Sequence, residues 1–88
     1  RGYAMIERQQ FRQAVIDAIK KVKELEDVSI ADSETFGDFG LDSLDGMDMV
    51  LQVEASLGID LGEFDLKEAN TIDRFHAKAC EILARRSG

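Results

Sequence analysis

Ser43 lies within the stretch 39–45, FGLDSLD, where a loop without helical period gives way to a periodic helix. Asp42 is a good helix N-cap, because its carboxylate can accept hydrogen bonds from the unpaired N–H groups of the first turn, and Asp45 is the acidic residue of a capping box. Ser43 then opens the helix with its hydroxyl pointing outward. The positive end of the helix dipole and the free backbone donors favour a phosphate esterified to the serine oxygen.

A catalytic role for Ser43 is not expected, because a catalytic serine requires a neighbouring base. The single histidine, His76, falls inside the last expected helix, and no lysine lies near the serine in sequence. A small hydrolase with Ser43 as its nucleophile remains a rival reading, which an active-site-directed phosphonate probe would test. The sequence predicts a modified serine and no catalytic residue.

Metal binding is not indicated either. If Gly46 were the glycine of a calcium loop, Leu41 would occupy the first ligand position and Gln52 the last, and neither supplies a carboxylate. No zinc-type pattern of cysteines or carboxylates surrounds His76.

Asp42-Ser43-Leu44 resembles the hallmark of the acyl carrier protein family, whose serine carries a 4′-phosphopantetheine arm. The resemblance extends upstream through 35–40, TFGDFG, and downstream through 59–61, IDL, and 71–73, TID, so that it covers most of the chain. It implies that a phosphopantetheinyl transferase and coenzyme A attach the arm to Ser43, with Asp42 and Leu44 beside it. It also implies that the arm holds acyl intermediates as thioesters and that the protein itself is not an enzyme.

The helix that starts at Ser43 carries two apolar lines. At 100° per residue, a core face forms from Gly46, Met49, Val50, Val53 and Leu57. A second line consists of Leu44, Met47 and Leu51. A chain this short cannot bury both lines, so the second is expected to meet a partner or the cargo. The alternative is that it contacts only the preceding loop and the next helix.

The resemblance implies that this helix docks loading, condensing or modifying enzymes. Acidic side chains surround the second line at Asp42, Asp45, Asp48 and Glu54. Such charges suit steering toward basic patches, after which Leu44, Met47 and Leu51 would bury a small apolar contact. An ordinary solvated acidic face is the alternative. Met49 and Val53 are expected to border a cleft that shelters the cargo.

Departures from the family pattern bear on the class of cargo. Peptidyl carriers typically show a Gly-Gly-x-Ser approach to the serine, which this chain lacks. Acyl cargo for fatty-acid, polyketide or related specialised biosynthesis is therefore expected, and a peptidyl, aminoacyl or D-alanyl carrier stays as the alternative. A rival of another class is an unmodified acidic helical adaptor that binds a protein through the second line.

Length and charge exclude other classes. At 88 residues and a net charge of −7, one domain is expected, and nucleic acid would be repelled. The single Cys80 is expected to be a buried reduced thiol. No apolar run or leader indicates a membrane or secretion, so we expect a cytoplasmic protein. We also expect it to be a monomer. Residues 1–4 do not join the later periodicity. We expect them to be residues left from expression of the protein, ahead of a native start at Met5, with a single carrier domain over 5–88. A free-standing carrier is expected, and a domain excised from a larger synthase is the alternative.

The pattern of apolar residues predicts an all-α four-helix bundle of acyl-carrier type. The first helix is expected from Ile6 to about Leu25, followed by a long loop over 26–41. The second runs from Ser43 to Leu57 and stops at Gly58. A short third helix is expected over 63–68, and a fourth begins after the cap Thr71.

Overall fold

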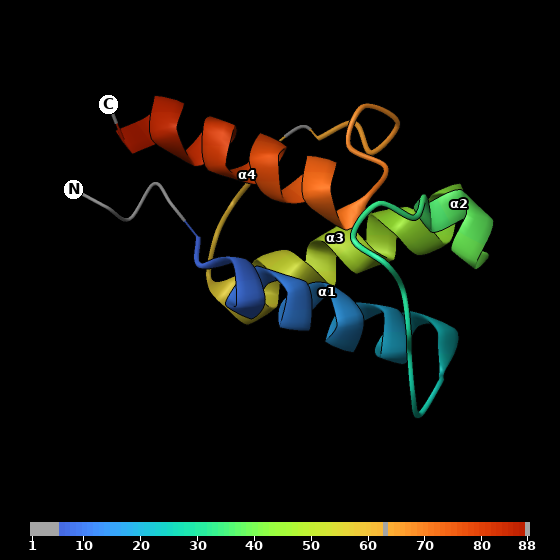
Figure 1. Ribbon diagram of the computed structural model, residues 1–88. Coiled ribbons are helices and arrows are strands. Elements are labelled where there is room, and N and C mark those ends of the chain that lie inside the picture. The colour runs from blue at the N-terminus through green and yellow to red at the C-terminus, as the bar shows by residue number, and fades with distance from the viewer. Residues whose placement is uncertain (1–5, 63, 88) are drawn as a thin grey trace.

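The computed structural model describes residues 6–62 and 64–87. The described chain forms α1 (Arg8–Lys23), α2 (Phe36–Phe39), α3 (Ser43–Leu57) and α4 (Ile72–Ser87), with no strand among the described residues (Figure 1). The all-α class predicted from the sequence is confirmed. The expected leader over 1–4 and the start at Met5 lie outside the described residues.

Each long helix begins at a side-chain cap. The Glu7 carboxylate accepts the N–H of Gln10 at 2.9 Å before α1. The Thr71 hydroxyl accepts the N–H of Arg74 at 3.0 Å before α4, as predicted. Gly58 ends α3 in the left-handed conformation, with φ of 66°, where glycine carries no Cβ penalty. The bounds of α3 are the predicted ones.

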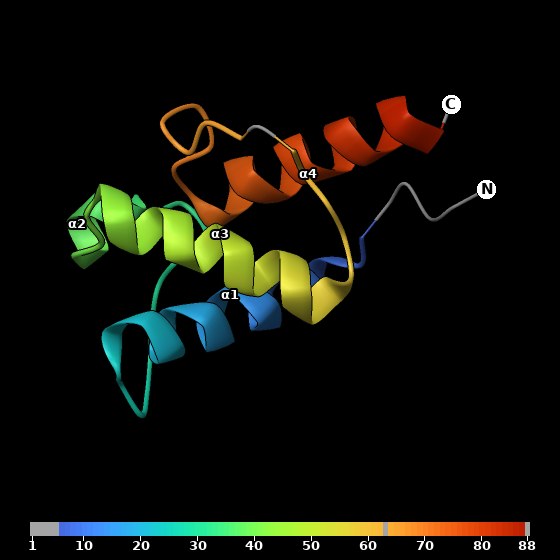
Figure 2. The ribbon, with the colours of Figure 1, turned by 180° about the vertical axis from the view of Figure 1, so that it is seen from behind.

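The core lies between α1, α3 and α4. Figures 1 and 2 show α1 and α3 side by side along their lengths, and the loop that follows α1 reaches the start of α4 before it enters α2. The largest fully buried side chains come from all three helices and from the segment between α3 and α4: Phe11, Val15, Ile19, Met49, Val53, Leu61, Ile72 and Phe75. Phe75 meets Phe11 edge to face, with ring centroids 4.9 Å apart, a geometry that adds to the stabilisation from buried area.

Side chains of α1 hold the long loop that follows it. Arg12 donates to the Asp32 carboxylate at 2.9 Å, and Arg8 donates to the same group at 3.2 Å. The carbonyl of Asp32 accepts the N–H of Asp73 at 3.1 Å. Ile30 is buried in the core. These contacts fix the approach of the chain to α2 and therefore to Ser43.

The predicted position of the short helix is wrong. The described residues between 62 and 70 contain no helix, and residues 66–68 form a turn. The Asp65 carboxylate accepts the N–H of Lys67 at 2.9 Å, and its carbonyl accepts the N–H of Glu68 at 3.1 Å. An aspartate that bonds its own following backbone favours a turn over a helix. The short helix is instead α2, within the loop expected to be irregular.

Candidate functional site

The N-terminus of α3 presents Ser43 to solvent. Asp42 Oδ1 accepts the N–H of Asp45 at 2.8 Å, and Asp45 Oδ2 accepts the N–H of Asp42 at 3.2 Å. The predicted capping box is therefore confirmed. The N–H groups of Ser43 and Leu44 lie in the first turn, where no intrahelical acceptor exists. An exposed hydroxyl thus stands beside free donors and the positive end of the helix dipole.

Asp45 has a second partner on α1. The Lys23 ammonium lies 3.1 Å from Asp45 Oδ2. The N–H of Asp42, and then Lys23, hold the pKa of the Asp45 carboxyl below its ordinary value of 3.8. Asp45 is therefore ionised at neutral pH and already paired within the molecule.

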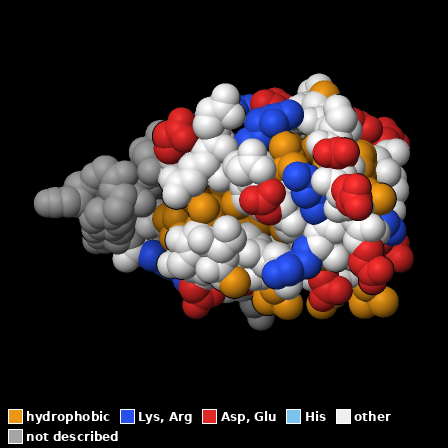
Figure 3. Space-filling view, turned by 90° about the horizontal axis from the view of Figure 1, so that it is seen from below, with side chains coloured by type: hydrophobic (Ala, Val, Ile, Leu, Met, Phe, Trp, Pro, Cys, Tyr) orange, Lys and Arg blue, Asp and Glu red, His pale blue; other side chains and the backbone are white. Residues whose placement is uncertain are grey.

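The second apolar line of α3 is in solvent. Leu44, Met47 and Leu51 are 70%, 63% and 60% exposed. The alternative was that these side chains contact only the preceding loop and the next helix. Any such contacts leave most of each side chain exposed to solvent. Asp48 is also exposed, and no salt bridge to it is found within the described residues. Figure 3 shows apolar and acidic side chains interspersed at the right-hand end of the view.

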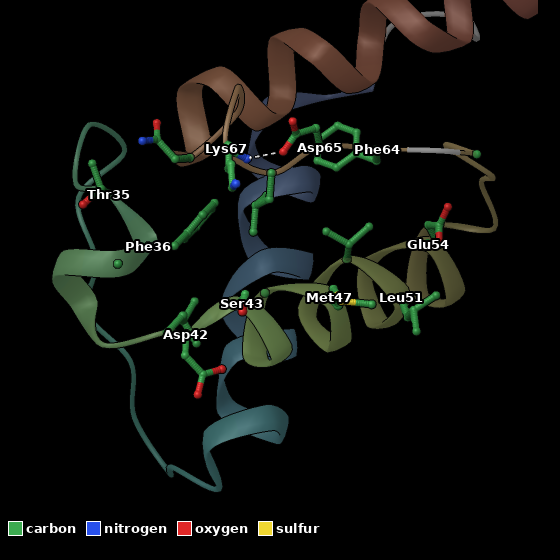
Figure 4. A pocket seen from close by; sticks show the side chains of 17 residues that line it. Thr35, Phe36, Asp42, Ser43, Met47, Leu51, Glu54, Phe64, Asp65 and Lys67 are labelled. Carbon is green, nitrogen blue, oxygen red and sulfur yellow. Dashed lines mark hydrogen bonds between the residues drawn. The ribbon is translucent and has the colours of Figure 1, made fainter.

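A cavity of about 640 Å³ lies beside Ser43. It runs between α3, α2 and the segment that precedes α4 (Figure 4). From α3 it is lined by Ser43, Gly46, Met47, Val50, Leu51 and Glu54. The facing wall includes Phe36, Leu41, Phe64, Leu66 and Asn70. The side chain of Phe36 points into this space from α2.

The expected cleft residues are wrong. Met49 and Val53 are 0% exposed and belong to the hydrophobic core. Neither lines the cavity; Val50 and Gly46 do. All four residues were assigned to one core face, yet Met49 and Val53 pack in the hydrophobic core, while Gly46 and Val50 border the cavity. A broad apolar stripe in sequence does not show which part of it meets a cavity.

Sequence reasoning missed the far wall of the cavity. No role in a site was predicted for Phe36, Phe64, Leu66 or Asn70, which line it. The sequence feature that could have indicated this wall is the pair of apolar residues on either side of Asp65, since large apolar side chains are most often buried against other residues. Glu54, expected as a surface charge, accepts the N–H of Leu61 at 2.7 Å and so joins α3 to the start of this segment.

The remaining reactive side chains lie away from the cavity. His76 Nε2 lies 2.7 Å from the carbonyl oxygen of Ile6, to which it can donate, and its ring packs edge-on against Phe11. Cys80 is half-buried, where a buried thiol was expected, and its sulfur lies 3.7 Å from His76 Nε2. Neither residue lines the cavity. Within the described residues, no group of histidine, cysteine and acidic side chains could hold a metal ion.

The fold and the exposed serine at the start of α3 agree with the helical carrier domain that the sequence predicts. Residues 13–77 match the family model described as a phosphopantetheine attachment site, and the chain belongs to this family. Comparisons with curated proteins and with solved structures gave no significant match.

Family membership establishes several properties. The chain is a carrier of the acyl carrier type, its cofactor is covalently attached 4′-phosphopantetheine, and it is not an enzyme. Carrier domains of this kind interact with phosphopantetheinyl transferases and with biosynthetic enzymes. No helix in the described part of the chain is long and apolar enough to cross a membrane.

Proposed function

We propose that Ser43 bears the 4′-phosphopantetheine arm and that the protein carries acyl intermediates of fatty-acid, polyketide or related specialised biosynthesis. The observation that supports this most directly is the position of Ser43. It is exposed at the first residue of a capped helix, and it borders an apolar cavity of about 640 Å³. The residues present suit the arm, because the free N–H groups at this helix end favour a phosphodiester.

The attachment step uses the serine hydroxyl. The Oγ of Ser43 forms a bond to the phosphorus that bears pantetheine in coenzyme A, and the bond from that phosphorus to the adenosine bisphosphate breaks. In this proposal the hydroxyl proton passes to a base of the transferase, and the single histidine of this chain, His76, does not border the cavity beside Ser43. When attached, the arm supplies a terminal thiol that holds an acyl group as a thioester. Asp42 and Asp45 hold the helix start that presents Ser43.

The exposed line of α3 is the proposed docking surface for these enzymes. Leu44, Met47 and Leu51 offer an apolar contact of three neighbouring, mostly exposed side chains. Asp48 adds an exposed negative charge beside them, with no salt bridge to it among the described residues, and the capping carboxylate of Asp42 adds another negative charge near the serine. Partners with basic patches fit this combination, since complementary charge speeds encounter and the apolar contact stabilises the complex. Asp45 contributes less, because Lys23 already pairs with it.

Intact mass after incubation with coenzyme A and a broad-specificity phosphopantetheinyl transferase tests the proposal. Ser56→Ala is the matched control, since Ser56 is another exposed serine of α3. The parent and Ser56→Ala should each gain one phosphopantetheine, and Ser43→Ala none. No gain in the folded parent would overturn the proposal and favour an unmodified adaptor. Gain in Ser43→Ala would assign the arm to another residue.

A further inference from the structure

Gly46 interrupts the row of α3 residues that faces the cavity. Ser43, Gly46, Val50 and Glu54 recur at intervals of three or four, so they lie along one side of the helix and all border the cavity. Glycine is a poor helix former at an interior position. A glycine one turn after Ser43 therefore calls for a packing reason.

The packing reason is the side chain of Leu66. A Cβ added at Gly46 would lie 2.6 Å from Leu66 Cδ2, closer than real Cβ contacts allow. Gly46 is buried and Leu66 half-buried. One methyl group of Leu66 thus fills the volume that any side chain at position 46 would occupy, on the line from Ser43 to Val50.

Leu66 can leave this position by rotating its side chain alone. Its backbone lies in turns closed by hydrogen bonds from Lys67 to the Asp65 carboxylate at 2.9 Å and from Ala69 to the Leu66 carbonyl at 3.1 Å. Those bonds do not involve the side chain, and leucine has alternative staggered rotamers. The space above Gly46 can therefore open while the cavity wall stays in place.

We infer that Leu66 is a displaceable plug over the bare backbone of Gly46, and that this pair sets how long an apolar acyl chain the cavity accepts. The inference rests on the proposed function, because the occupant is a chain tethered through Ser43. An apolar chain is favoured because Phe36, Leu41, Val50 and Phe64 share the cavity with the plug. A chain entering from the Ser43 end meets Gly46 before Val50, so it must displace Leu66 to go further.

The test loads saturated acyl groups of increasing length onto the protein. A broad-specificity transferase attaches each acyl-phosphopantetheine from its acyl-coenzyme A, and intact mass verifies loading. The readouts are the rate of thioester cleavage by hydroxylamine and the melting temperature at each chain length. In the parent, cleavage should slow as the chain lengthens, up to a limiting length.

Substitutions at the two positions should move that limit in opposite directions. Gly46→Ala forces Leu66 toward the cavity and should shorten the limit, with cleavage about fourfold faster for each methylene excluded, the factor that corresponds to burial of about 0.8 kcal/mol per methylene. Leu66→Ala removes the plug and should lengthen it. The double variant should return toward the parent, because the added Cβ fills the vacated volume.

Two controls separate the pair from general effects. Gly37→Ala adds the same methyl group at another glycine that borders the cavity, with no atom within 4 Å of the new Cβ. Leu83→Ala shortens a half-buried leucine that does not line the cavity. Neither should change the limiting length. If Gly46→Ala does not fold, Leu66→Ala decides alone, since it adds nothing to the helix.

The outcomes distinguish this inference from the proposed function. A parent that accepts no arm on Ser43 would overturn both. If the parent is loaded but Gly46→Ala and Leu66→Ala both keep the limiting length of the parent, that result would overturn the inference alone. So would a change of equal size in Gly37→Ala, because the added volume would then act without displacing Leu66.

Discussion

Lys23 Nζ lies 3.1 Å from Asp45 Oδ2, so the last residue of α1 is ion-paired with the first turn of α3. The same oxygen accepts the N–H of Asp42 at 3.2 Å. One carboxylate therefore joins two helices and caps one of them, directly beside Ser43. This arrangement makes the start of α3 dependent on the end of α1.

The Lys23–Asp45 pair should contribute to stability against acid. The pKa of Asp45 is lowered from 3.8 in the folded protein, so its charge stabilises the fold above about pH 4, and that contribution is lost as the pH falls through the folded value. Lys23→Met removes one cause of the lowering and should move the acid unfolding midpoint to higher pH, as measured by circular dichroism. Lys21→Met is the control, and an equal shift in it would show a net-charge effect.

The cap at Asp42 should stabilise α3 through its side-chain acceptor. Asp42→Ala removes the acceptor for the N–H of Asp45 and should cost about 1 kcal/mol, which lowers the melting temperature by roughly 4–8 °C in a domain of this size. Asp42→Asn is the matched control, because asparagine caps helices about as well as aspartate. Equal loss in both variants would assign the stabilisation to charge instead of the hydrogen bond.

Charge reversal at Asp48 should weaken docking without unfolding the protein. The side chain is exposed, and surface substitutions away from special features usually change stability by less than about 0.5 kcal/mol. Asp48→Lys should slow association with a basic phosphopantetheinyl transferase, measured by surface plasmon resonance, with the difference shrinking at high salt. Asp17→Lys makes the same charge change on α1. Equal slowing by Asp17→Lys would show that total charge, not this helix, steers the partner.

The Glu54–Leu61 hydrogen bond should protect the start of the segment that walls the cavity. Glu54 Oε2 accepts the N–H of Leu61 at 2.7 Å, and hydrogen bonds to charged groups contribute about 1.5–3 kcal/mol. Glu54→Ala should therefore speed exchange of the Leu61 amide hydrogen by roughly tenfold or more. Hydrogen exchange followed by NMR measures this. Glu68→Ala, at another acidic residue, should leave that amide unchanged; unchanged exchange in Glu54→Ala would contradict the prediction.

Local signals explain why α3 could be predicted from the sequence. Its start depends on Asp42 and Asp45, three residues apart, and its end on Gly58. The residues that interact at each end of the helix are close neighbours in sequence, so the local sequence is enough to predict both ends. The capping residue of α4, Thr71, could be predicted for the same reason.

Distant contacts explain what the sequence did not reveal. A four-residue helix is not stable alone, and α2 is held by the N–H of Phe36, which donates at 2.9 Å to the carbonyl of Asn70. The contact between Gly46 and Leu66 likewise joins residues far apart in the chain. Nothing within either segment indicates its partner. The misplaced short helix and the misassigned cleft both follow from this.

Met47 and Leu51 each have two surroundings, because they border the cavity and are also more than half exposed. A protein surface pressed against α3 would touch the same side chains that form one edge of the compartment within. An enzyme bound to α3 would thus contact side chains whose positions depend on whether an acyl chain occupies the cavity. It could detect that chain, or promote its release, through these two side chains and without any movement of the helix itself.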